Sequence, residues 1–363
     1  DYNTLPIEMG SFKNLAIIGP LADAPHEQMG TWTFDGKKEW CVTPLQAIKK
    51  ELEEADINIH YAKGLKNSRS KDDSGFQEAI EAASKSEVVL LFMGEESILS
   101  GEAHSRANID LPGAQNQLLK EISKLGKSTI LIIQAGRPLT LDSARHLANS
   151  VIYAWHPGTM GGPAISDVIF GKFNPCGKLP VSFPKLTGQI PIYYNQRNTG
   201  KPASPDTFTY IDDIPEKAHQ TSVGNTSFHL DAGYEPLYPF GYGLSYSHFR
   251  YHHIWLSHDS FHIGKTLEVF AEISNSSDRD GYETAQLYIR DLVASTTRPV
   301  KELADFKKVF IPANETVTVS FKIHSDQLSF YGRENKEITE PGQFEAFIGG
   351  DSNTNLKTNF TLM

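Results

Sequence analysis

The first half of the chain alternates short apolar runs with longer amphipathic segments, and this alternation constrains the fold more than any other feature. The apolar runs are of strand type and span residues 14–19, 57–61, 87–93, 129–134, 151–154 and, last, about 181–183. The segments between them, which we expect to be largely helical, span residues 43–54, 76–85, 112–125, 139–148 and 160–170. Thr43 and Pro44 mark one helix start, because Thr is a favoured N-cap and Pro suits the first helical position. Strands separated by helices form βαβ units, so an α/β sandwich with a mainly parallel sheet is predicted.

The composition and the hydrophobic periodicity of the chain change after residue 189. Pro and Gly recur up to residue 246 without strong periodicity, so we expect a long connector that is ordered where aromatic residues cluster. Beyond it, apolar and polar residues alternate at 267–273, 284–289, 317–323 and 344–348, with turn-forming residues between the runs. About seven short strands are expected, as in a β-sandwich of immunoglobulin or fibronectin type III kind. The expected domains are an α/β domain at 1–200, a connector at 201–245 and a β-sandwich at 246–363.

Charge and composition exclude several classes of function. The chain has 363 residues and a formal net charge of −10, so it is a poor candidate for binding nucleic acid or an anionic membrane. No apolar run reaches the ~18 residues that suggest a membrane span. Cys41 and Cys176 form no zinc or Cys-x-x-Cys pattern, which leaves one disulfide or two unpaired thiols open and predicts no metal site. Since the chain begins at Asp1, we expect a processed protein or a piece of a longer one.

The loop at residues 94–112 is the richest in chemistry. It follows the predicted strand at 87–93 and contains the carboxylates Glu95, Glu96 and Glu102. Ligands of open α/β sheets bind at the carboxyl ends of strands, and a long loop inside a compact domain is often functional. A glycosidase needs one carboxylic acid to protonate the leaving oxygen and a second carboxylate as nucleophile or base. Glu102 follows the flexible Gly101 and is the candidate acid, whereas Glu95 and Glu96 are either functional or solvated loop charges.

Three further residues are candidates for substrate binding. His104 and Arg106 follow Glu102 and could hold sugar hydroxyls, or they could simply tie the loop down. Trp32 follows the first predicted strand, so it belongs to the same edge of the sheet. Its ring could pack on the C–H face of a sugar or cover the core. No dinucleotide fingerprint, Walker motif or G-x-S-x-G motif is present, so no cofactor is predicted.

Five segments together resemble the C-terminal portion of glycoside hydrolase family 3, the β-glucosidase and β-xylosidase family. They are residues 13–23 (KNLAIIGPLAD), 136–141 (GRPLTL), 155–202, 237–246 (LYPFGYGLSY) and 298–306 (RPVKELADF). The resemblance spans nearly the whole chain and is strongest to bacterial, often periplasmic, three-domain β-glucosidases. It implies an α/β sandwich followed by a fibronectin type III domain, and a parent protein that is periplasmic or secreted.

The resemblance also implies a division of catalytic labour. The family's general acid/base is a glutamate in a loop of the sandwich domain, and Glu102 matches it best, with Glu96 as the second choice. The family's nucleophile is an aspartate in an N-terminal barrel, within a Ser-Asp-Trp type motif that this chain lacks. We therefore expect the C-terminal part of a retaining exo-β-glycosidase. Together with the barrel, this part would act on a β-glycoside or an oligosaccharide, without a metal or a cofactor. Without the barrel, the chain would be inactive.

Two other functions remain open at this point. The chain could be a carbohydrate-binding module that holds glycans beside Trp32 and Glu102 without chemistry, or a scaffold whose fibronectin-like domain mediates contacts. An exposed apolar surface is predicted where the barrel would dock, and such a surface favours self-association into a homo-oligomer. A barrel encoded directly before Asp1 would favour the enzyme over both alternatives.

Overall fold

The computed structural model describes residues 4–363 and divides into two compact units. The first unit comprises Asp1–Phe173 with Lys185–Thr187, and the second comprises Asn174–Pro184 with Gly188–Met363. The segment expected as a connector, 201–245, thus belongs to the second unit. The domain limits proposed from the sequence were drawn from changes in composition and periodicity and not from contacts between residues. They remain a proposal.

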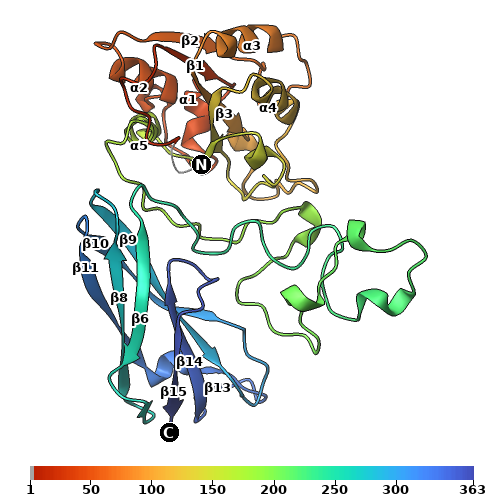
Figure 1. Cartoon of the computed structure of the whole chain (residues 1–363), viewed down its shortest axis with the longest axis vertical. Helices are drawn as coiled ribbons and strands as arrows, with labels where there is room; N and C mark the ends of the chain where they lie inside the picture. The colour runs from red at the N-terminus through yellow and green to blue at the C-terminus, as the bar shows by residue number, and fades with distance from the viewer. Residues whose placement is uncertain (1–3) are drawn as a thin grey trace. The chain divides into compact units, whose positions relative to one another are not determined.

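The first unit is built on a parallel five-stranded sheet in the order β2-β1-β3-β4-β5 (Figure 1). Its strands are β1 (Asn14–Ile18), β2 (Asn58–Ala62), β3 (Val88–Gly94), β4 (Ser128–Gln134) and β5 (Ser150–Tyr153). Every residue of β3 is buried, as expected for a central strand with both faces covered. The predicted parallel sheet is therefore confirmed. The strand expected at about 181–183 is wrong, because these residues lie outside this sheet and Phe183 forms only an isolated bridge to Tyr238.

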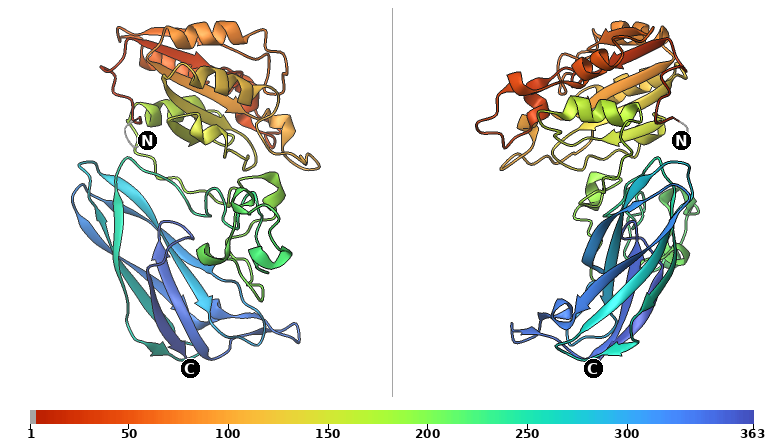
Figure 2. Two further views of the ribbon diagram at one scale, coloured as in Figure 1. Left: turned by 45° about the vertical axis from the view of Figure 1, so that its right-hand side comes forward. Right: turned by 90° about the vertical axis from the view of Figure 1, so that its left-hand side faces the viewer.

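Helices cover both faces of this sheet (Figure 2). They are α1 (Pro25–Met29), α2 (Pro44–Glu51), α3 (Phe76–Ser84), α4 (Gln115–Ser123) and α5 (Gly161–Ile169). The predicted start of α2 is confirmed: the Thr43 hydroxyl accepts from the Gln46 amide, and Pro44 is the first helical residue. The α2 and α5 helices pack together and share a core with alternate residues of β1, β3 and β4, whereas α3 packs against α4.

One predicted helical segment is absent. Within 139–148 only a 3-10 turn forms, at Ala144–His146. The amide of Thr140 donates to the carbonyl of Ile109 at 3.1 Å, and the amide of Leu139 donates to the Tyr153 hydroxyl at 3.2 Å. These long-range bonds keep the beginning of the segment out of a helix, so tertiary contacts here override the local pattern.

The direction in which successive strands are added to the sheet reverses between β1 and β3. The chain leaving β1 runs to α2, and the chain leaving β3 runs to α4, which lies on the opposite face of the sheet. In an open parallel sheet of this order, the point where successive connections diverge is where ligands bind, at the carboxyl ends of the strands. The loops that follow β1 and β3 meet at this point, and they carry Trp32 and Glu102 respectively.

The second unit is a β-sandwich. One sheet has the order β10-β9-β14-β15-β7 and the other β11-β8-β6. The long strands are β6 (Phe249–Leu256), β8 (Thr266–Asn275), β9 (Gly281–Asp291), β10 (Glu302–Ile311), β11 (Thr316–His324), β14 (Gly342–Gly349) and β15 (Lys357–Leu362). Three strands have two residues each: β7 (Ser260–Phe261) lies at the edge of the first sheet, whereas β12 (Phe330–Tyr331) and β13 (Glu337–Ile338) pair in a separate two-stranded sheet. Inward-facing side chains of both sheets, including Leu267, Leu287 and Phe321, form one core, which confirms the predicted sandwich.

The segment before the sandwich is ordered by aromatic contacts, as expected. The ring of Tyr194 stacks on Phe240 at 4.3 Å between centroids, and Phe208 packs edge-on against Tyr210, Phe228 and Tyr234. Both cysteines are free thiols, which settles the alternative left open by the sequence. Over the part of the chain that the structure describes, the search for a helix long and apolar enough to cross a membrane finds none.

Candidate functional site

The loop after β3 leaves the sheet at a position that only glycine fits. Gly94 has φ +137°, and a Cβ there would lie 1.8 Å from the carbonyl oxygen of Gln134 on β4. Gln115 at the start of α4 fixes both backbone groups of Gly94: its Oε1 accepts from the amide at 2.8 Å and its Nε2 donates to the carbonyl at 2.8 Å. The loop therefore starts from a rigid point. We call residues 95–100 its stem and residues 101–105 its turn.

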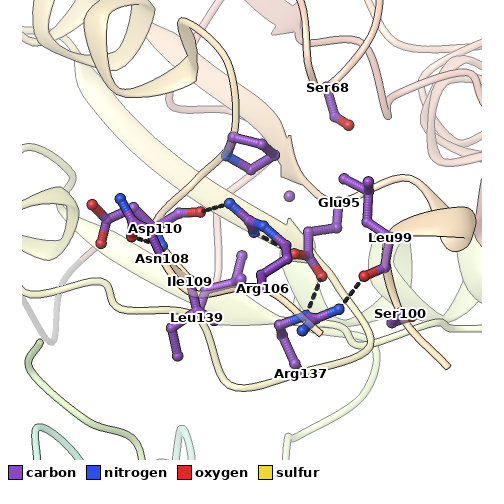
Figure 3. Close-up of polar contacts among 12 residues, drawn as sticks. Ser68, Glu95, Leu99, Ser100, Arg106, Asn108, Ile109, Asp110, Arg137 and Leu139 are labelled. Atoms are coloured by element: carbon purple, nitrogen blue, oxygen red, sulfur yellow. Dashed lines mark hydrogen bonds and ion pairs between the residues drawn. The ribbon is translucent and has the colours of Figure 1, made fainter. Parts of the chain in front are cut away.

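The stem begins with a buried ion cluster (Figure 3). The Glu95 side chain is 0% exposed and accepts from Arg106 through Oε1 and from Arg137 through Oε2, the latter at 3.0 Å. A buried carboxylate is tolerated only when it is paired and hydrogen-bonded. The interpretation of Glu95 as a solvated loop charge is therefore wrong. Arg106 also donates to the carbonyl of Asp110 at 2.9 Å, so this arginine ties the two ends of the loop together.

Glu96 is held as firmly as its neighbour. Its side chain is 12% exposed, and its two oxygens accept from Nε and Nη2 of Arg69, at 2.9 and 3.1 Å. The Ser68 hydroxyl donates to the same carboxylate at 2.7 Å. Burial raises the pKa of Glu96, but the hydrogen bonds from Arg69 and Ser68 lower it more, so the pKa lies below its usual range. A carboxyl kept ionised is poorly suited to donate a proton, which weakens Glu96 as a candidate acid.

The turn presents Glu102 to solvent. Gly101 and Ala103 both have positive φ, at +103° and +63°, and the amide of His104 donates to the carbonyl of Gly101 at 3.2 Å to close the turn. Glu102 is exposed and makes no hydrogen bond or ion pair with residues 4–363. His104 is also exposed, and its Nδ1 lies 3.2 Å from the carbonyl of Ser100. Of the three loop glutamates, Glu102 alone is free to approach a ligand.

The loop after β1 packs directly against this turn. The Thr31 hydroxyl donates to the carbonyl of Ser97 at 2.6 Å and lies 3.1 Å from the Ser100 hydroxyl. A Cβ at Gly101 would meet Cγ2 of Thr31 at 2.6 Å and Cζ2 of Trp32 at 3.6 Å, so the indole lies alongside the Glu102 turn. Trp32 is 60% exposed, which makes its interpretation as a cover of the core wrong. Phe34, 88% exposed, lies 6.1 Å from Trp32 between ring centroids.

The stem is fixed from two further sides. Glu27 on α1 accepts from the amide and the hydroxyl of Ser97, at 2.7 and 2.9 Å. Nε2 of His156 lies 3.3 Å from the Ser100 hydroxyl, while its buried Nδ1 has no partner among residues 4–363. Burial lowers the pKa of His156 against the opposing effect of Glu95 and Glu27, which favours the neutral ring. A neutral imidazole can accept the Ser100 proton or donate to its oxygen.

The structure brings together residues that the sequence did not link to the site. Ser68 and Arg69 follow β2, Arg137 follows β4, and His156 follows β5. Arg137 and His156 lie in two segments that carry the family resemblance, 136–141 and 155–202, but neither they nor Ser68 and Arg69 were assigned to the site from the sequence. The signal that could have grouped them is positional, because the carboxyl ends of parallel strands meet at one edge of the sheet. Within the described residues, no group of three or more His, Cys, Asp or Glu side chains is arranged to hold a metal ion.

Comparison with known proteins identifies the family. Residues 1–246 match the glycosyl hydrolase family 3 C-terminal domain, and residues 283–352 match the fibronectin type III-like domain. A periplasmic β-glucosidase of Salmonella typhimurium is 36% identical over 99% of this chain and 47% of its own length. A β-xylosidase of Formosa agariphila is 35% identical over 99% of this chain and 47% of its own length.

Solved structures agree with these relatives. The crystal structure of a β-glucosidase from Listeria innocua in complex with isofagomine superposes with a TM-score of 0.87 and 33% identity, over 99% of this chain and 47% of that one. The chain spans about half the length of the curated relatives that it matches. It belongs to glycosyl hydrolase family 3, of which it carries the C-terminal domain and the fibronectin type III-like domain.

Proposed function

We propose that this chain supplies the general acid/base of a retaining exo-β-glycosidase of the β-glucosidase type, and that Glu102 is this residue. The observation that carries the proposal is the difference among the three glutamates of one loop. Glu95 and Glu96 are held in ion pairs, whereas Glu102 is exposed, unpaired within residues 4–363 and beside the exposed ring of Trp32. It lies at the carboxyl ends of β1 and β3, where the strand order reverses and where a ligand of such a sheet is expected.

In the proposed mechanism, the carboxyl group of Glu102 acts in both steps, first as an acid and then as a base. Protonated Glu102 donates to the glycosidic oxygen as the leaving group departs. As a carboxylate it then takes a proton from the water that hydrolyses the glycosyl-enzyme. The nucleophile must lie about 5–5.5 Å from this carboxyl. The membership in family 3, whose nucleophile is an aspartate of an N-terminal barrel, leads us to place the nucleophile in that barrel and to expect the chain alone to be inactive. The mechanism requires neither metal nor cofactor.

The other site residues divide into two roles. Trp32 offers an exposed ring beside the turn, which suits packing against the C–H face of a sugar. Exposed His104 can reach a substrate hydroxyl from the same turn. Arg106 has both of its bonded nitrogens directed at the loop itself, which favours an anchoring role over the substrate contact predicted from the sequence.

The names of the relatives suggest a substrate class and a cellular compartment. The Salmonella relative is described as a periplasmic β-glucosidase and the Formosa relative as a β-xylosidase. We therefore propose terminal β-linked glucosides or xylosides as the substrate class, and a periplasmic or secreted parent protein. The barrel would be the partner of the first unit, and apolar side chains left exposed without it would favour a homo-oligomer.

The test uses this chain fused behind the N-terminal barrel of a family 3 β-glucosidase, which we call the barrel-fused enzyme. In its Glu102→Ala variant, hydrolysis of an activated aryl β-glycoside should stall at the glycosyl-enzyme. Azide needs no general base, so it should restore turnover and give the β-glycosyl azide, as a retaining mechanism requires. An active Glu102→Ala variant that azide does not affect would contradict the proposal.

A glycan-binding module without chemistry is the second candidate, favoured by the exposed pair of Trp32 and Phe34. It predicts that the isolated chain binds a β-glucan oligosaccharide, and that binding is lost in Trp32→Ala but unchanged in Glu102→Gln. If the barrel-fused enzyme is also inactive, this result would favour the binding module over the enzyme.

A further inference from the structure

Arg137 holds both ends of the turn that carries Glu102. Its Nη2 donates to the carbonyl of Leu99 and, at 2.8 Å, to the carbonyl of His104. One guanidinium nitrogen thus closes the chain on either side of Ser100, Gly101, Glu102 and Ala103 (Figure 3 shows the Leu99 contact).

The guanidinium is itself fixed from two directions. Its Nε donates to Glu95 at 3.0 Å, and the Arg137 side chain is 17% exposed. The Tyr153 hydroxyl on β5 donates to the Arg137 carbonyl and accepts from the amide of Leu139 at 3.2 Å, which holds the backbone. Glu95 directly follows Gly94, whose backbone is bonded to Gln115. Arg137 and Glu95 therefore connect the turn to β3 and β5 through hydrogen bonds, and these two strands fix the position of the turn.

The turn has little else to hold it. Gly101, Glu102, Ala103, His104 and Ser105 are all exposed, and their backbone passes through two left-handed conformations. On the side of Ser100, contacts with Thr31 and His156 hold the chain where it enters the turn. Beyond it, Arg137 bonds to the carbonyl of His104, and Arg106 bonds to Glu95 and Asp110.

We propose that Arg137, oriented by Glu95, is a positioning residue for the acid/base carboxyl of Glu102. The proposal rests on Glu102 being the acid/base. Arg137 does not touch the substrate; it keeps the turn at the distance and angle from which the carboxyl reaches the glycosidic oxygen. A misplacement of about 1 Å at a catalytic group can cost about 10²-fold in rate. A carboxyl placed on an exposed turn requires such a fixed frame.

The first test uses the chain as it is. Hydrogen–deuterium exchange of residues 100–105 should become at least several-fold faster in Arg137→Lys and Arg137→Met, while β3 and β4 keep their protection. Lysine keeps the charge beside Glu95 but lacks the forked donors that span three acceptors. The matched control is Arg145→Met, because Arg145 lies in the same segment, forms an exposed pair with Asp142 and touches neither Glu95 nor the turn.

The second test separates positioning from simple destabilisation in the barrel-fused enzyme. Protonation matters most for poor leaving groups, so Arg137→Lys should lower kcat by about 10²-fold for a methylphenyl or alkyl β-glycoside. For a dinitrophenyl β-glycoside, which leaves without a proton, the glycosylation step measured in a single turnover should change by only a few-fold. Loss of folded protein would lower both rates equally, and Arg145→Met should change neither.

The outcomes separate the two proposals. Equal losses for both leaving groups, or unchanged exchange of residues 100–105 in Arg137→Lys, would overturn the positioning role. If Glu102→Gln itself showed no dependence on the leaving group, the assignment of Glu102 would fail, whatever the exchange data on Arg137 show. If Arg137→Met does not fold, the comparison of Arg137→Lys with Arg145→Met decides.

Discussion

The stem and the turn of the loop after β3 contain the same kind of side chain in opposite environments. In the stem, Glu95 is buried, Glu96 is half-buried, and the two are bonded to three arginines; in the turn, Glu102 is exposed and unpaired within residues 4–363. A buried, paired carboxylate resists change because its partners would be left without compensation. An exposed one can gain and lose a proton at little cost to the fold. The comparison teaches that rigidity and reactivity are assigned to different glutamates of one loop, seven residues apart at most.

The largest expected difference between stem and turn is in catalysis. Glu102→Gln in the barrel-fused enzyme should lower kcat/KM for a poor leaving group by about 10²–10⁴-fold, the usual contribution of general acid–base catalysis. Its free energy of unfolding should stay within about 0.5 kcal/mol of wild type, because exposed substitutions rarely do more. Steady-state kinetics and urea unfolding measure the two quantities. A large loss of stability would show that Glu102 belongs to the frame instead.

The stem should show the reverse pattern. Glu95→Gln removes the charge between Arg106 and Arg137 and leaves two partly buried cations without compensation, at a cost of about 3 kcal/mol. Urea unfolding of the chain, monitored on the first unit, measures this loss, with Glu102→Gln as the control of the same chemistry. If both variants unfolded at the same urea concentration, the contrast between stem and turn would not hold.

A smaller effect is expected at the neighbouring aromatic residue. Trp32→Ala removes the ring beside the turn and should raise KM by several-fold, which corresponds to about 1 kcal/mol of aromatic packing, with little change in kcat. The control is Trp40→Ala, which removes a comparably exposed ring that forms a cation–π contact with Lys37. Equal effects of the two substitutions would remove Trp32 from the substrate site.

The smallest effect concerns the dependence of stability on pH. The pKa of Glu96 is lower in the folded state than in the unfolded chain, so this carboxylate stabilises the fold above about pH 4.3, its unfolded pKa. That contribution is lost as the pH falls through the folded pKa. Glu96→Gln should therefore be less stable than wild type at pH 7, and the gap should narrow in acid. Unfolding of both proteins at pH 7 and pH 3 measures the gap; a constant gap would contradict the assignment.

Much of the fold was predictable because its signals are local. Thr43 and Pro44 predicted the start of α2, and the alternation at 267–273 predicted β8. The predictions failed where distant partners decide. Thr140 is held by Ile109, and Phe183 pairs with Tyr238, so neither segment follows its own pattern.

The candidate site shows the same limit. The sequence identified the loop, and the topology then brought Trp32 beside Gly101, next to Glu102. The sequence singled out Glu102 but could not show that Glu95 is buried and paired, because one partner of Glu95, Arg137, is 42 residues away along the chain. Whether a carboxylate is buried or exposed is decided by such partners and not by its neighbours in sequence.

The most direct test of the account is hydrolysis of aryl β-glucoside and β-xyloside by this chain alone and by the barrel-fused enzyme, each as wild type and as Glu102→Gln. We predict no turnover by the chain alone. The barrel-fused enzyme should turn over substrate, and its activity should be lost in Glu102→Gln when the leaving group is poor. Turnover by the chain alone that disappears in Glu102→Gln would contradict the account, because a second catalytic carboxylate would then lie within these 363 residues.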